Sequence, residues 1–258
     1  MHRNEGSTLL GLGWLEWALG LDAALMGIAF VSSVAIVPAF FHALAAGHDP
    51  AAMGIPIAGQ AAFLTASLLL GLGILVLAAA GVLSVRSGAA DDGPRHARFA
   101  PFAVPFFLLA LGAFASHLIL PREATMIMGA PDEMLPVPAW AVLLRIALCG
   151  LVALFSGLTI YASAAGLATG RVLTRLRIGT GLGVLSAVAG AVFGVAAFGE
   201  TSVDAYVTVL KAHSIAGEGI AILSLAVFIL AIRELREDLA SRVPADTPAG
   251  TSAAAAVP

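Results

Sequence analysis

The sequence predicts an all-α membrane protein, a polytopic bundle of six transmembrane helices with both chain ends in the cytoplasm. Three observations lead to this prediction. Of the 258 residues, 60% are hydrophobic and only 11% are charged, whereas soluble domains carry about 25% charged residues. The apolar residues form long runs, near the roughly 20 residues that a helix needs to cross a bilayer. The arginines gather at one set of ends of those runs.

The chain begins with a segment, residues 1–20, that we expect to lie at the membrane interface. Trp14 and Trp17 flank Glu16 there, and tryptophan prefers the headgroup region. The six spans that follow are expected over residues 21–46, 60–85, 100–120, 138–166, 177–198 and 206–232. Residues 233–258 are expected to form a disordered cytoplasmic tail, because this stretch ends in a composition of Ser, Pro, Thr, Ala and Asp.

Two of the spans carry local signals of their own. In the third span, Pro101 and Pro105 are tolerable because the first-turn amides of a helix have no intrahelical partners. In the fifth span, small residues fall along one helical stripe and predict close helix packing. They are Gly183, Ser186, Gly190 and Gly194.

Charge sets the predicted orientation. Ten of the 13 Lys and Arg residues lie at ends that alternate with acidic loops, and positively charged loops stay cytoplasmic. These ten are Arg3, Arg86, Arg95, Arg98, Arg171, Arg175, Arg177, Arg233, Arg236 and Arg242. The interpretation is a multi-pass protein of the inner (cytoplasmic) membrane, in contact with the lipid bilayer. A net charge of −3 gives no basic surface for nucleic acid.

The predicted topology brings ionisable groups together in the outer half of the membrane, where they tend to face a bundle interior or a wet cavity. They are His42, His117, His213, Arg145, Lys211 and Glu218. The fourth span carries a polar stripe of Arg145, Cys149, Ser156, Thr159 and Ser163. On a regular sixth helix, Lys211, Ser214 and Glu218 share a face, and His213 points away from Lys211.

Haem b is one candidate ligand of these groups. Neutral imidazole is a common axial ligand of haem iron, so two of His42, His117 and His213 form a candidate pair. Arg145 and Lys211 would then neutralise the propionates. The competing interpretation is that the histidines only form hydrogen bonds at the interface.

A quinone is the second candidate. Quinol oxidation needs a proton acceptor and a polar group on each carbonyl, and Glu218 with His213 supplies the acceptors while Arg145 orients the ring. Glu218 and Arg145 are therefore the candidate catalytic residues. The alternative is that Glu218 forms an ion pair with Arg145 or Lys211 that only holds helices together.

Copper is a third candidate ligand. Met126 and Met128 lie in the predicted outer loop and are soft ligands suited to Cu(I), unless they simply cap the bundle. The chain has one cysteine, Cys149, so it forms no internal disulfide.

Three functions follow from these candidate sites. The first is an integral membrane subunit of a redox system that binds haem b or quinone near the outer face and works with partner subunits. The alternative is a small transporter or channel whose path is lined by the polar stripe of the fourth span, and the third is a copper-handling membrane protein. An assembly protein without chemistry of its own also fits. We see no nucleotide, zinc-protease or serine-nucleophile motif in the sequence.

Overall fold

The computed structural model describes residues 5–48, 58–88, 100–119, 139–198 and 203–242, and every regular element in those ranges is a helix. The predicted all-α class is therefore confirmed. The first long helix comprises α1 (Glu5–Val31), a π-helical turn η1 (Ser32–Ile36) and α2 (Val37–Ala45). The others are α3 (Ala58–Gly88), α4 (Ala100–Ile119), α6 (Ala139–Ala164), α7 (Gly170–Phe198), and the continuous series α8 (Val203–His213), π-helical η4 (Ser214–Glu218) and α9 (Gly219–Arg242).

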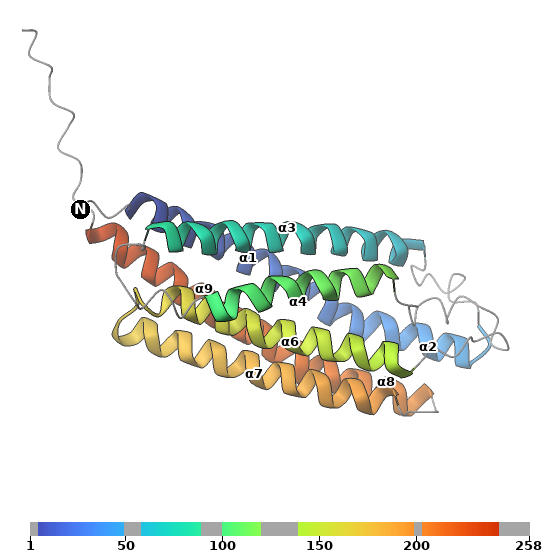
Figure 1. The fold of residues 1–258 in the computed structure, drawn as a ribbon. Coiled ribbons are helices and arrows are strands. Elements are labelled where there is room, and N and C mark those ends of the chain that lie inside the picture. The colour runs from blue at the N-terminus through green and yellow to red at the C-terminus, as the bar shows by residue number, and fades with distance from the viewer. Residues whose placement is uncertain (1–4, 49–57, 89–99, 120–138, 199–202, 243–258) are drawn as a thin grey trace, which may run out of the picture.

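The helices lie side by side along one axis and alternate in direction (Figure 1), so that α1 begins at the same end of the bundle at which α9 finishes. In the described residues, five helices are long and apolar enough to cross a membrane: Gly6–Ala43, Ser67–Ser87, Trp140–Ala164, Gly170–Ala196 and Asp204–Arg242. The apolar part of α4, Phe102–Ser116, is shorter. Five candidate spans agree with a multi-pass membrane protein, while the sixth crossing stays a prediction.

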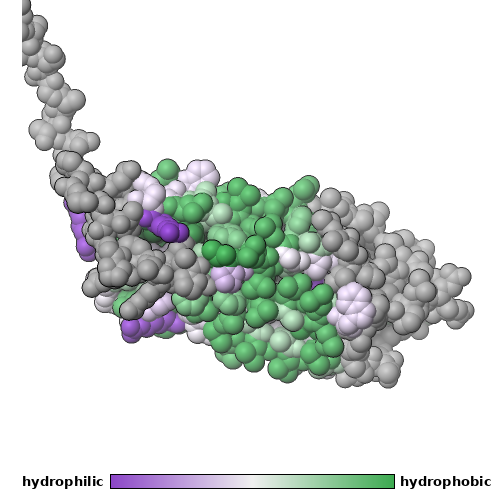
Figure 2. Space-filling model, viewed as in Figure 1, coloured by the Kyte–Doolittle hydropathy of each residue, from purple (hydrophilic) through white to green (hydrophobic). Residues whose placement is uncertain are grey.

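The outer surface of the bundle is suited to lipid. Figure 2 shows an apolar belt around the middle of the visible face, with hydrophilic residues at the end where α1 begins. Large side chains such as Leu69, Val76 and Leu108 are more than half exposed. Exposed tryptophans stand near both ends, Trp17 on α1 and Trp140 on α6, as expected at two membrane–water interfaces.

The α1 helix continues through Gly20, where we expected an interfacial segment to give way to the first span. Its first half is packed in the bundle, with Leu12 and Leu15 almost fully buried. Backbones meet here: a Cβ added to Gly11 would lie 2.6 Å from the Val85 nitrogen and 2.7 Å from the Gly81 oxygen. Residues 5–20 are thus one end of a long helix, of which one face packs closely on α3.

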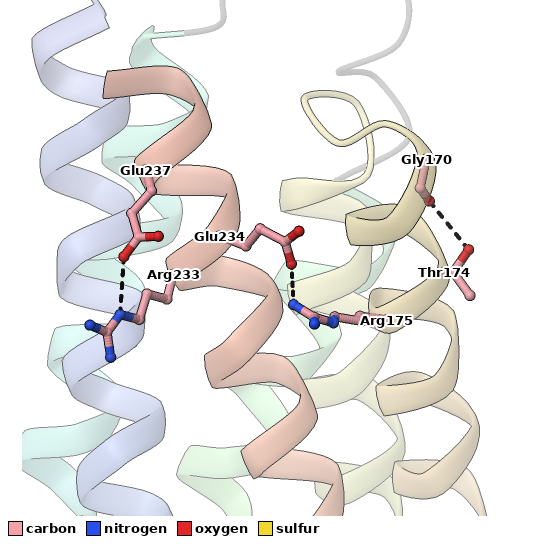
Figure 3. Close-up of polar contacts among 6 residues, drawn as sticks. All are labelled: Gly170, Thr174, Arg175, Arg233, Glu234 and Glu237. Carbon is pink, nitrogen blue, oxygen red and sulfur yellow. Dashed lines mark hydrogen bonds and ion pairs between the residues drawn. The ribbon is translucent and has the colours of Figure 1, made fainter. Parts of the chain in front are cut away.

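The α9 helix continues to Arg242, so the expectation of a disordered tail from residue 233 is wrong for residues 233–242. Contacts with other helices explain the extension. Arg175 of α7 donates to Glu234 (Figure 3). A guanidinium nitrogen of Arg236 lies 2.7 Å from a carboxylate oxygen of Glu16 on α1. Leu235, 1% exposed, joins the core. Residues 243–258 of the expected tail lie outside the described residues.

Polar contacts within helices also occur at this end. Arg233 donates to Glu237 one turn further along α9, at 3.1 Å, and Thr174 donates to the carbonyl oxygen of Gly170 at the start of α7, at 3.2 Å (Figure 3). An exposed ion pair four residues apart stabilises a helix by about 0.3–0.5 kcal/mol, whereas a Thr hydroxyl bonded to the carbonyl four residues back adds no such support. The ion pair supports the end of α9 without fixing the tertiary fold.

The arginines share one end of the molecule, as the sequence predicts. The described residues contain nine Arg and Lys, and all except Arg145 and Lys211 lie where α1 and α7 begin and where α3 and α9 finish. They are Arg86, Arg171, Arg175, Arg177, Arg233, Arg236 and Arg242. We call this the arginine-rich end. That it faces the cytoplasm stays a prediction.

Candidate functional site

A cavity of about 390 Å³ lies among α6, α7, α8 and η4, toward the end of the bundle opposite the arginine-rich end. Arg145 of α6, His213 of α8 and Glu218 of η4 line it together. The volume is within the roughly 300–1,000 Å³ typical of sites for small organic ligands. Three of the residues proposed from the sequence therefore meet around one space.

Small residues on α7 make room for this cavity. The Ser186 hydroxyl donates to the Gly217 carbonyl oxygen at 2.8 Å. A Cβ on Gly217 would lie 3.6 Å from the Gly190 Cα, and a Cβ on Gly190 would lie 3.8 Å from the His213 ring. At these positions the small-residue stripe packs on η4 and His213 at ordinary van der Waals distances. It sets η4 directly against α7.

Two π-helical turns shape the site. In η4 the Gly219 amide donates to the Ser214 carbonyl, and in η1 the Val37 amide donates to the Ser32 carbonyl, both five residues apart. The two turns are joined by the Ser33 hydroxyl, which donates to Glu218 Oε1 at 3.5 Å. Such turns are rare and often found at functional sites.

The π turn corrects the helical phase that we expected for the sixth span. Residues five apart are about 140° from each other on an α-helix, which would put His213 and Glu218 on different faces. The π turn closes on residues five apart, and both His213 and Glu218 line the cavity. Lys211, expected on the same face as Glu218, is exposed and is not among the lining residues.

Two buried polar atoms at the cavity have no hydrogen-bond partner among the described residues. They are His213 Nδ1 and Glu218 Oε2. Buried polar groups are nearly always hydrogen-bonded to protein or ordered water, and leaving one unpaired costs about 1–3 kcal/mol. These atoms therefore mark the point at which a polar ligand or water would bind.

A second cavity of about 520 Å³ adjoins the first and extends toward the arginine-rich end. Met26, Cys149, Ala153 and Ser186 line both cavities. The polar stripe of α6 runs along the pair: Arg145 and Cys149 border the first, and Cys149, Ser156 and Thr159 border the second. Four of the five stripe residues thus line a cavity, whereas Ser163 lines neither.

His42 lies apart from this site. It is exposed, and its Nδ1 is 3.7 Å from Asp204 Oδ1 at the start of α8. Asp204 precedes His213 by nine residues, a rise of about 13 Å along the helix. His42 thus contacts the start of α8 and is not among the residues that line the cavity.

The remaining candidates lie at or beyond the limits of the described residues. His117 is in the last turn of α4, and its side chain is not described. Met126 and Met128, the candidate copper ligands, lie outside the described residues. Within those residues, no group of three or more His, Cys, Asp or Glu side chains is placed to hold a metal ion.

Asp22, Met26 and Ser33 share one face of the first helix by helical period, but they are not among the candidates drawn from the sequence. In the structure Asp22 and Met26 line the cavities, and the Ser33 hydroxyl donates a hydrogen bond to Glu218. Tyr206, also missed, lines the first cavity and packs on Phe41 of α2 with ring centroids 5.1 Å apart. The helical period predicts that Asp22, Met26 and Ser33 share a face, but it does not predict which residues of other helices they contact.

No family model, curated protein or solved structure matches this chain. The functional argument therefore depends on the geometry of the site.

Proposed function

We propose that the protein is an integral membrane subunit of a redox system, and that the cavity lined by Arg145, His213 and Glu218 binds the ring of a quinone. The proposal includes six crossings of the inner (cytoplasmic) membrane, with the arginine-rich end in the cytoplasm and the cavity near the outer face. The described residues are almost all helical, and in this proposal partner subunits supply or take up the electrons.

The unpaired His213 Nδ1 and Glu218 Oε2 carry this proposal. A quinol hydroxyl donates to either atom, and the guanidinium of Arg145 donates to a quinone carbonyl. The rest of the wall is mainly apolar, from residues such as Ile146, Phe193 and Leu210. An apolar slot with a few convergent polar groups suits a flat, weakly polar ring.

Oxidation of one quinol releases two protons and two electrons. Each hydroxyl loses its proton to an acceptor at hydrogen-bond distance, and Glu218 and His213 are those acceptors. The electrons pass to a redox centre of a partner subunit. The reverse reaction, quinone reduction, uses the same residues as proton donors.

The geometry favours quinone over a haem held by His42 and His213, since His42 stands beside Asp204 and away from the cavity. A haem ligated by His117 and His213 remains a separate hypothesis. An absorption spectrum of the dithionite-reduced protein, expressed with haem supplied, distinguishes the two. A haem α band that disappears in His213→Gln supports haem as the ligand. A colourless protein excludes haem and keeps quinone as the candidate ligand.

The test uses the purified protein in mild detergent, with a tail-less benzoquinone and its quinol as separate ligands in calorimetric titrations. Glu218→Gln preserves the size of the side chain but removes the charge that accepts a quinol hydroxyl. We expect quinol affinity to fall about 10-fold, the effect of one hydrogen bond to a charged group, while quinone affinity changes little.

Lys211→Gln and His42→Gln are the matched controls, because both residues are exposed and away from the cavity. Neither should change affinity for either ligand. The proposal is wrong if the wild-type protein binds neither quinone nor quinol, or if Glu218→Gln and the controls behave alike.

A transporter is the second candidate, favoured by one observation: the polar stripe of α6 borders two adjoining cavities. Arg145 would then bind an anionic solute on its path. Proteoliposomes that carry wild-type protein should take up such a solute, and Arg145→Ala should abolish the uptake. Normal uptake by a correctly folded Arg145→Ala protein would argue against this function.

A further inference from the structure

The second cavity is large and apolar, and most helices of the bundle contribute to its walls. Its walls come from α1, α3, α4, α6, α7 and α9, and its volume is about 520 Å³. Hydrocarbon side chains form most of the lining, among them Leu72, Leu75, Phe106 and Phe114. Asp22 and Cys149 are the ionisable residues in this lining.

The cavity lies where two pairs of helices separate, and we call these pairs, α1 with α3 and α4 with α6, the two arms of the bundle. The α3 helix packs closely along α1, and α4 packs along α6, whereas α3 and α4 make little contact with each other. The cavity includes residues of both arms, such as Leu68 on α3 and Ala110 on α4. The gap between these arms gives the cavity a side that faces the lipid.

Such a space is not left empty in a membrane. Protein interiors and lipid are close-packed, and atoms that line a void lose their dispersion contacts. Water is a poor filler, because a stable buried water needs two to four polar partners, and this lining is mostly hydrocarbon. The physical requirement is a flexible apolar chain.

We propose that the second cavity binds the isoprenoid tail of the quinone whose ring occupies the first cavity, so that the substrate class is a long-tailed membrane quinone. This inference rests on the proposed function. The two cavities share Met26, Cys149, Ala153 and Ser186 in their walls, so a ring beside Glu218 and a tail along α6 form one continuous ligand. The tail leaves the bundle between α3 and α4.

Gly71 offers a direct way to fill the second cavity. It lines that space, and a Cβ built on it meets no atom within 4 Å. Gly73, two residues further along α3, is equally free of neighbours but is exposed and lines neither cavity. Gly71→Phe and Gly73→Phe thus make the same change on one helix, inside and outside the proposed tail site.

The experiment measures affinity for quinones with one ring type and no tail, a short isoprenoid tail or a long one. The wild-type protein should bind the long-tailed form on the order of 10-fold more tightly than the tail-less form, through the added packing contacts. Gly71→Phe should remove this difference and keep tail-less binding. Gly73→Phe should behave like the wild type.

Each other outcome has a defined meaning. If tail-less quinone binds but the wild type shows no tail dependence, the cavity holds a phospholipid acyl chain and the tail inference is wrong, while the quinone site stands. Undiminished tail dependence in Gly71→Phe also overturns it, as does equal loss in Gly73→Phe. If no quinone binds at all, the proposed function itself fails.

A measurement on the wild-type protein avoids any folding defect of the variants. A quinone with a photoreactive group at the end of its tail should crosslink to peptides of α3 or α4 that line the second cavity. An excess of unlabelled long-tailed quinone should suppress this crosslink. Crosslinks that persist under competition would contradict a specific tail site.

Discussion

At the scale of single residues, the molecule keeps ionisable groups in its interior that lipid would strongly disfavour. Arg145, His213 and Glu218 share the first cavity, where polar ligand atoms can satisfy His213 Nδ1 and Glu218 Oε2. Asp22 differs, because it lines the apolar second cavity and makes no hydrogen bond or ion pair with another described residue. Its position suggests a cost to stability rather than a role in binding the ring.

Replacing Asp22 by leucine should therefore stabilise the protein. Insertion scales assign about 2.5–3.5 kcal/mol to an aspartate at the centre of a membrane helix, and we expect a gain on the order of 1–3 kcal/mol. Thermal unfolding in detergent would show a higher Tm, with affinity for tail-less quinone unchanged, because Asp22 does not line the first cavity. A lower Tm would mean that Asp22 has a stabilising partner, and lost binding of tail-less quinone would mean that it contributes to the ring site.

At the scale of helices, glycines and π turns decide how the elements meet. Gly11 and Gly81 bring the backbones of α1 and α3 into close contact, whereas Gly190 and Gly217 pack α7 on η4 at ordinary van der Waals distances. The π turns η1 and η4 then present Ser33 and Glu218 to each other across the bundle. The glycines thus determine where the helices pack on one another, and the π turns determine which side chains face the site.

The contact between α1 and α3 can be tested with two alanine substitutions in α1. Gly11→Ala would place its Cβ 2.6 Å from the Val85 nitrogen, so the helices must separate. Gly20→Ala meets nothing within 4 Å and should gain up to about 1 kcal/mol of helix propensity. We expect a Tm several degrees lower for Gly11→Ala, and an equal or higher Tm for Gly20→Ala. Equal effects of the two would contradict the close approach.

At the scale of the whole molecule, the two ends differ in packing. The fully buried side chains gather toward the arginine-rich end, where Leu12, Leu176, Phe228 and Ile232 form the core. The two cavities occupy the middle and the opposite end. The bundle is thus closed on the side predicted to face the cytoplasm, and its polar site is nearer the other side.

The predicted orientation can be tested with a protease-sensitive tag after Pro258 and a second, different tag before Met1. With the arginine-rich end in the cytoplasm, protease added to intact cells should leave both tags uncut, and inverted membrane vesicles should lose both. An external loop tag between α4 and α6 serves as the opposite control. Cleavage of the terminal tags in intact cells would reverse the orientation and move the site to the cytoplasmic half.

The sequence by itself determined the helical class, the positions of the long apolar segments and the gathering of cations at one end, because hydropathy and charge are properties of local composition. It also identified Arg145, His213 and Glu218 as candidates. Only the tertiary structure decided that these three meet, that Lys211 and His42 do not join them, and that a second cavity continues from the first. The reason is physical: a π turn changes the phase of a helix without a signal in the hydrophobic period, and the space between helices depends on how all of them pack.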